Sequence, residues 1–197
     1  MSSGVSCARD ADTSPTKIIV HRNRNLTAIS LAERYFAGHG AATVDDLARW
    51  AGIPKAEARA ALAAAAASLE SAECDGATYW FAPGAAEAAA GARGAAARER
   101  AHLLPGFDEY MLGYTGRSHQ LGEHLETYGS KVAANGMLAP TIVVGGRAVG
   151  VWRRTLKPKT VSFETTEFQP LDAATRAVIA AEQERYARFV AREVSPG

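Results

Sequence analysis

Apolar residues in the first third of the chain recur at the spacing of amphipathic helices. The first predicted helix has one apolar face, formed by Ile29, Ala32, Tyr35 and Phe36. Thr43 is the predicted N-cap of a second helix, with Asp46 at the position where a capping box usually has Glu or Gln. Leu47 and Trp50 are expected to face inward from this helix, and Gly52 is expected to end it.

A third helix and a hairpin are predicted next. Pro54 stands in the first turn of an alanine-rich segment, where proline is compatible with a helix. The pair Asp75-Gly76 separates two β-prone arms and is typical of a two-residue hairpin turn. Three helices and a hairpin over residues 26–84 match a winged helix-turn-helix domain. The alternative is a small helical bundle with an incidental hairpin, and we favour the winged helix.

The second half of the chain has the alternation of β-strands. Gly145-Gly146 lies between two apolar arms and predicts a hairpin with a primed turn, and residues 159–168 predict a further strand. Asp172 is the predicted cap of a last helix, whose apolar face includes Tyr186 and Phe189. The simplest assembly is a small antiparallel β-barrel-like domain covered by this helix.

Segments without an apolar period precede and join these two domains. Residues 1–25 are polar apart from a short apolar run, and we expect a flexible tail there. Residues 85–101 are rich in alanine and glycine and form the predicted linker. The expected fold class is therefore α+β, with a winged helix-turn-helix at 26–84 and a β-rich domain with a C-terminal helix at 102–197.

The overall composition is that of a globular protein. Hydrophobic residues make up 47% and charged residues 22%, and the formal net charge is +1, so attraction to a polyanion requires local clustering of cations. Cys7 and Cys74 form no CxxC pair, which fits a reducing cytoplasm. No segment approaches the roughly 18 apolar residues that span a bilayer, so we expect a cytoplasmic protein without a membrane partner.

One segment departs from this charge balance, because residues 141–160 contain five cations and no acid. The cations are Arg147, Arg153, Arg154, Lys157 and Lys159. With strict strand alternation, the valines mark the buried side, and Trp152 and Arg154 face solvent. Cations on a rigid hairpin suit contact with nucleic-acid phosphates. The alternative is an edge strand whose charges prevent edge pairing, and we favour phosphate contact.

The predicted helix-turn-helix carries a weaker signal. Such a domain reads bases with its last helix, where this chain offers Lys55 and Arg59 and then a run of alanines without hydrogen-bonding groups. We therefore expect docking on the DNA backbone rather than readout of a base sequence.

No catalytic or metal-binding constellation is evident. His119 and His124 bracket Glu123, but they lack helical i, i+4 spacing and a further clustered donor, so no metal site is expected. Asp108 and Glu109 could form an acid–base pair, but neighbours in an extended chain point opposite ways. The chain has no glycine-rich phosphate loop and no nucleophile-elbow motif, and we expect no cofactor.

Four blocks of the sequence resemble a known family. They are residues 31–62, 76–84, 102–118 and 135–171, and the most specific runs are LLPGFDEYMLGY and TIVVGGRAVGVWRR. They resemble the bacterial winged-helix DNA-binding family that includes the crosslink-repair DNA glycosylases, over residues 26 to about 192. The resemblance is to the C-terminal portion of that family. It implies tandem winged helices followed by a β-barrel-like domain, and in some members metal-free hydrolysis of N-glycosidic bonds.

The catalytic residues implied by the resemblance have no counterpart here. The family pair is a glutamine, one residue, then a glutamine or aspartate, and none of Gln120, Gln169 and Gln183 is followed in this way. We therefore expect a protein that binds double-stranded DNA without catalysis of its own. The alternatives are a glycosylase in which Asp108 or Glu109 activates water, and a regulatory protein that binds another protein. The candidate DNA-binding residues are Arg147, Arg153, Arg154, Lys157, Lys159, Lys55, Arg59 and Arg117.

Overall fold

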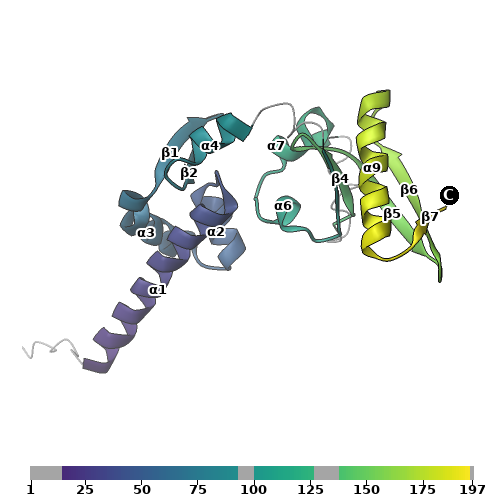
Figure 1. The fold of residues 1–197 in the computed structure, drawn as a ribbon. Coiled ribbons are helices and arrows are strands. Elements are labelled where there is room, and N and C mark those ends of the chain that lie inside the picture. The colour runs from purple at the N-terminus through teal and green to yellow at the C-terminus, as the bar shows by residue number, and fades with distance from the viewer. Residues whose placement is uncertain (1–14, 93–99, 127–137, 196–197) are drawn as a thin grey trace, which may run out of the picture. The chain divides into compact units, whose positions relative to one another are not determined.

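The chain folds as two compact units, with the division between Ala82 and Pro83, two residues before the predicted end of the first domain. The computed structural model describes residues 15–92, 100–126 and 138–195 (Figure 1). Each unit is described separately below, starting with the N-terminal one.

The first unit contains three helices and a hairpin. Its elements are α1 (Pro15–His39), α2 (Val44–Ala51), α3 (Lys55–Ala65), a 3₁₀ turn (Ala66–Ser68), β1 (Glu70–Cys74) and β2 (Ala77–Phe81). After Pro15 the sequence has no glycine or proline until Gly38, so nothing in it interrupts a long first helix. Residues 15–25 are therefore helical where we expected a flexible tail, and residues 1–14 lie outside the described residues.

The turns of the first unit follow the sequence signals. Thr43 caps α2, and its backbone N–H donates to a carboxylate oxygen of Asp46 at 2.8 Å, which completes the capping box. Gly52 ends this helix in the left-handed conformation, with φ of 63°. Asp75 and Gly76 both have positive φ, 49° and 75°, as a primed turn between β1 and β2 requires. These predictions are confirmed.

The second unit is built around one five-stranded sheet. Its elements are α4 (Ala85–Ala92), β3 (Ala101–Leu104), α6 (Glu109–Leu112), α7 (Ser118–Leu121), a 3₁₀ turn (Gly122–His124), β4 (Thr141–Val144), β5 (Arg147–Leu156), β6 (Thr160–Glu167), α9 (Ala173–Phe189) and β7 (Glu193–Val194). The strand order is β3-β4-β5-β6-β7, and only the β6–β7 pair is parallel. The described strands form a curled half-barrel sheet with edges at β3 and β7 rather than a closed barrel. The α+β class is confirmed.

The predicted linker is partly structured. Residues 85–92 form α4, and β3 begins at Ala101, which was the last residue of the predicted linker. Residues 93–99 lie outside the described residues.

The sheet is packed on both faces (Figure 1). On one face α9 covers a cluster formed by Ala101, Ile142, Trp152 and Ile179. On the other face α6 and α7 cover a cluster formed by Met111, Leu121, Leu138, Ala148 and Phe168. Because neither face of the central strands is open, the functional surface of this unit must be sought at the sheet ends and edges.

A bulge in β5 changes which side chains share a face. Ile142 pairs with Gly150 but Val143 pairs with Ala148, so Val149 is an extra residue in the strand. Ala148 and Val151 consequently pack in the cluster under α6 and α7, whereas Val149 and Trp152 pack in the cluster under α9. A side chain at Gly150 would collide with the backbone oxygen of Thr166, so the bulge requires glycine. The prediction that the valines mark one buried side and that Trp152 faces solvent is wrong, because it assumed uninterrupted alternation.

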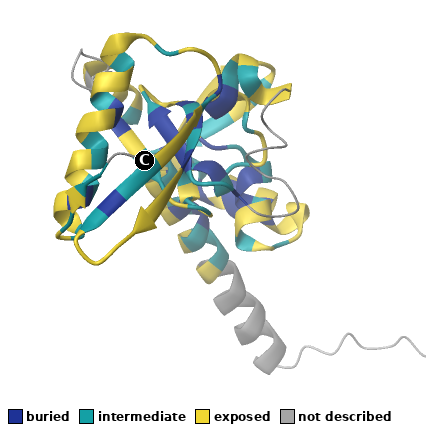
Figure 2. Ribbon diagram, turned by 90° about the vertical axis from the view of Figure 1, so that its right-hand side faces the viewer, coloured by how far each residue is buried: buried dark blue, intermediate teal, exposed yellow. Residues whose placement is uncertain are grey.

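The β5–β6 hairpin extends beyond β3 and β4, and β7 pairs with β6 at Thr160 and Val161. The last β4 residue opposite β5 is Thr141, which pairs with Val151, and beyond Trp152 the only described partner of β5 is β6. From Arg153 to Lys159 every residue is exposed (Figure 2). We call residues 153–164 the projecting hairpin.

An ion pair joins the far end of β6 to α9. Arg176 donates to the two carboxylate oxygens of Glu167 at 2.7 and 2.9 Å, and the backbone N–H of Leu171 adds a third hydrogen bond at 3.1 Å. The hydrogen bonds from Arg176 have the largest effect on the pKa of Glu167, and the bond from Leu171 adds to it. Together they lower this pKa from 4.5 to about 2. The ionised form is thus preferred in the folded state.

This pKa predicts a pH-dependent contribution to stability. Because the pKa is lower in the folded than in the unfolded chain, the contribution is present above about pH 4.5 and is lost as the pH falls toward 2. Urea denaturation of the wild type and of Glu167→Gln should show a difference in unfolding free energy that shrinks over this interval. Glu164→Gln, on the same strand and exposed, is the control. A Glu167→Gln difference that stays constant down to pH 2 would contradict this interpretation.

Candidate nucleic-acid interface

The tip of the projecting hairpin is held by the segment that follows α9. The Nε of Arg192 donates to the carbonyl oxygen of Lys157 at 2.8 Å, and the backbone N–H of Glu193 donates to that of Lys159 at 3.0 Å. Lys157 N–H also donates across the turn to the Thr160 oxygen at 2.8 Å. These bonds use the backbone of the tip and leave both lysine ammonium groups exposed. The sequence carried no signal for the role of Arg192, which acts across 35 positions of the chain.

Three of the predicted cations lie exposed on this hairpin. Arg153, Lys157 and Lys159 are exposed, and within the described part of the chain no ion pair involves any of them. Glu164 lies opposite Arg153 in the strand register, yet no ion pair joins the two. The hairpin therefore offers three positive charges, and no carboxylate in the described ranges forms an ion pair with them.

Arg154 occupies a different environment. Its guanidinium carbon lies 5.8 Å from the ring centroid of Trp152 and 5.3 Å from that of Tyr186 on α9. Trp152 is 2% exposed, and its indole N–H donates to the carbonyl oxygen of Leu104 at 2.8 Å. We predicted a solvent-facing Trp152 ring beside a cation. The structure instead has a buried Trp152 ring on the face covered by α9, with the Arg154 guanidinium over it.

Arg147 lies at the other end of β5. A strand rises about 3.3 Å per residue, so the separation from the hairpin tip is about 30 Å. The Arg147 guanidinium lies against Gly122, whose φ is 55°, and a side chain at that glycine would collide with it. Nearby, the hydroxyl of Tyr110 donates to the Gly146 oxygen at 2.7 Å. Burial raises the pKa of Tyr110, and the positive charge of Arg147 partly opposes this increase. Arg147 therefore does not form one cluster with the projecting hairpin.

The remaining candidate cations lie elsewhere. Lys55 and Arg59 are exposed on α3 in the first unit, and the Lys55 ammonium forms an ion pair with Asp45 at 2.6 Å. Arg117 stands at the start of α7, half-buried, and its Nε donates to the Met111 carbonyl oxygen at 3.0 Å. The structure therefore brings together only the cations of the projecting hairpin.

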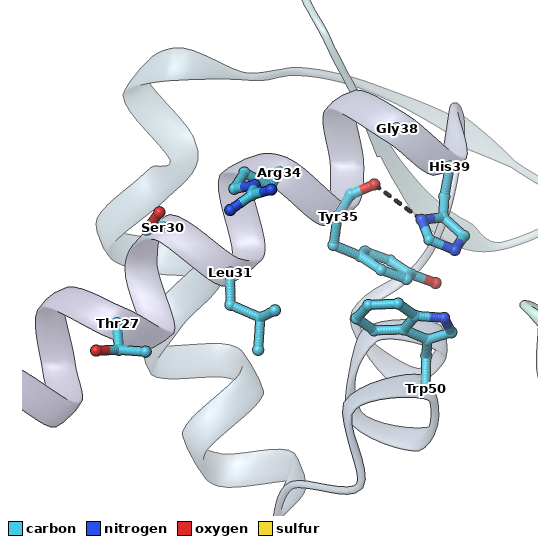
Figure 3. A pocket seen from close by; sticks show the side chains of 8 residues that line it. All are labelled: Thr27, Ser30, Leu31, Arg34, Tyr35, Gly38, His39 and Trp50. Atoms are coloured by element: carbon cyan, nitrogen blue, oxygen red, sulfur yellow. Dashed lines mark hydrogen bonds between the residues drawn. The ribbon is translucent and has the colours of Figure 1, made fainter.

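A pocket of about 800 Å³ lies between α1 and α2 in the first unit (Figure 3). The rings of Tyr35 and His39 stack with their centroids 4.2 Å apart, and the centroid of the Trp50 ring lies 5.1 Å from each of those centroids. Trp50 is 42% exposed and lines the pocket together with Arg34. The prediction that Trp50 faces inward is therefore wrong, since only part of its ring is covered.

The described residues contain neither a metal cluster nor a membrane span. No group of three or more His, Cys, Asp or Glu side chains within 15–92, 100–126 and 138–195 could hold a metal ion. The Nε2 of His124 lies 3.9 Å from a carboxylate oxygen of Glu123. The carboxylate of Asp108 caps α6 and accepts the backbone N–H of Tyr110 at 2.9 Å. None of the helices in these ranges combines the length and the apolar character needed to cross a bilayer.

Comparison with known proteins gives the family. A model of the family described as "DNA glycosylase AlkZ-like" matches residues 8–189, and the chain belongs to this family. Among solved structures, the chain is similar to Streptomyces sahachiroi DNA glycosylase AlkZ, with a TM-score of 0.66 and 25% sequence identity over 88% of this chain and 46% of that chain. The chain thus spans about half the length of this relative. A search of curated proteins finds no match.

Proposed function

We propose that this chain binds double-stranded DNA through the projecting hairpin, as a DNA-repair protein that has no glycosylase activity of its own. The observation that carries the proposal is a backbone-anchored hairpin tip that presents Lys157 and Lys159 without acidic partners among the residues that the structure describes, with Arg153 at its base. Cations on a preorganised element release condensed counterions from DNA with little ordering cost to the protein. Membership of a DNA glycosylase family supports DNA as the polyanion.

We further propose that the first unit is a winged helix that supplies a second contact. Its three helices are followed by a hairpin, and an isolated antiparallel bridge between Ala42 and Trp80 ties the α1–α2 connection to β2. Such a small sheet beside a helix-turn-helix is the expected plan of a wing. The exposed face of α3 offers Arg59 and mostly alanine, which supports backbone docking rather than base readout.

The test is a fluorescence anisotropy titration of the full chain with a duplex of generic sequence between 50 mM and 400 mM salt. The proposal predicts binding whose logarithm falls linearly with the logarithm of the salt concentration. Absence of binding at the lowest salt, or binding that salt does not weaken, would reject a phosphate-contacting role.

The family match makes glycosylase activity the second candidate. The sequence lacks the paired glutamine motif of the family, and the carboxylate of Asp108 already caps α6. We therefore expect no abasic sites when the chain is incubated with an N7-alkylated duplex and the product is treated at neutral pH with an endonuclease that cleaves at abasic sites. Asp108→Asn is a matched control, because asparagine also caps helices and keeps the fold. Strand cleavage by the wild type that disappears in this variant would establish the enzyme and refute the binding-only proposal.

A further inference from the structure

An exposed aromatic side chain in an unusual backbone conformation stands between β3 and α6. Phe107 has φ of 63°, in the left-handed region that bulky residues rarely adopt, and it is 52% exposed. Among the described residues, the other two non-glycine residues with positive φ are Asp75, in a tight turn, and Ala191, at the end of α9. Strain of this kind persists only where the surroundings impose it, and it concentrates at functional sites.

The backbone on both sides of Phe107 is held by contacts of its neighbours. Before it, the Leu104 carbonyl oxygen accepts the Trp152 indole N–H at 2.8 Å, and Gly106 lies so close to the Leu138 oxygen that a Cβ would be 2.9 Å away. After it, Asp108 caps α6 through the Tyr110 N–H. The loop is thus fixed on both sides of Phe107, whose side chain is about half exposed.

The loop emerges at the end of the sheet from which the hairpin projects. Leu104, the last residue of β3, pairs with Thr141, and Thr141 pairs with Val151, two residues before Arg153. Gly106 lies near Pro140, and the Pro140 carbonyl oxygen accepts the backbone N–H of Trp152 at 3.1 Å. Phe107 therefore stands near the base of the projecting hairpin, where an apolar ring accompanies the cationic surface.

We propose that Phe107 enters the base stack of bound duplex at an unpaired or extruded position, an inference that rests on the proposed DNA binding. Apolar side chains that insert between base steps accompany backbone-contacting cations in many DNA-binding proteins. An aromatic ring stacks on any base because every base has a π-face. A ring on a fixed loop stacks without first losing conformational freedom.

The test uses the full chain and a duplex that carries 2-aminopurine opposite one abasic position. Wild-type binding should raise the 2-aminopurine emission as the base leaves its stack. Phe107→Gly should lower the affinity for this duplex at least about fivefold, the lower end of what one base–aromatic stack contributes. It should also abolish the emission change and leave the salt slope unaltered, because the ring contacts no phosphate. Phe107→Trp should retain both signals.

Stability measurements and a second phenylalanine make the test decisive. Glycine adopts positive φ freely, so Phe107→Gly should not lower the melting temperature; a large decrease would assign the ring to the core and overturn the proposal. Phe189, which is 86% exposed at the end of α9, gives the matched control Phe189→Ala. An equal loss in both variants, or none in Phe107→Gly, rejects stacking by Phe107. Failure of the wild type to bind DNA would instead reject the underlying function.

Discussion

Replacing Lys157 and Lys159 with glutamine should lower the affinity for duplex DNA about 50-fold at 0.1 M salt. Each phosphate contact contributes about 0.9 to the slope of log affinity against log salt, so two lost contacts should flatten the slope by about 1.8. The two ammonium groups stand on a tip whose backbone is held by Arg192 and Glu193. Because those bonds do not involve the lysine side chains, the hairpin should remain folded. Anisotropy titrations at several salt concentrations measure both quantities.

A charge-matched variant separates local contact from net charge. Arg176→Gln with Arg185→Gln removes the same two positive charges, but these side chains already pair with Glu167 and Glu182. This variant should leave the salt slope within about 0.5 of the wild type, because neither cation is available to a phosphate. Equal flattening in both variants would show that DNA responds to overall charge rather than to the projecting hairpin.

The largest effect on stability is expected from Trp152. Its ring fills the cluster beneath α9 and is 2% exposed, so Trp152→Ala should lower the unfolding free energy of the second unit by about 3–5 kcal/mol. Trp152→Phe retains most of the volume but leaves the Leu104 oxygen without its donor, and should cost about 1–3 kcal/mol. Urea denaturation followed by far-ultraviolet circular dichroism measures both values.

The same pair of variants decides between the two interpretations of the β5 face. A tryptophan that faced solvent would lose little stability on truncation and would change mainly DNA affinity. A decrease of less than about 1 kcal/mol in Trp152→Ala, together with weaker DNA binding, would contradict the buried position. Since Trp50 and Trp80 both belong to the first unit, their fluorescence reports that unit independently in either variant.

Local chemistry made the turns and caps predictable from the sequence. Asp75-Gly76 and Gly145-Gly146 form hairpin turns because few other pairs tolerate two successive positive φ angles. Asp172 caps α9, and its side chain accepts the N–H of Thr175 at 2.6 Å. These features depend on neighbouring residues alone, so composition and spacing were sufficient to place them.

Side-chain orientation depended on contacts that the sequence does not display. One extra residue at Val149 reverses the faces of β5. The isolated Gly150 within the strand is a signal for such a bulge, but our prediction assumed uninterrupted alternation. Phe189 was expected on the apolar face of α9 but is exposed, while Ala187 is buried. Two residues are separated by roughly 200° around a helix, so the two side chains lie on opposite sides of α9. The positive φ of Phe107 was likewise not indicated by the sequence, because phenylalanine rarely adopts that conformation.

The most direct test of the proposed interface is photocrosslinking from a single position. In a chain carrying Cys7→Ser and Cys74→Ser, Lys159→Cys places a photoreactive thiol label at the hairpin tip. Gln169→Cys places the same label on an exposed residue beyond the other end of β6. We predict crosslinks to bound duplex from position 159 and far fewer from position 169. Equal yields, or crosslinks from position 169 alone, would contradict binding by the projecting hairpin.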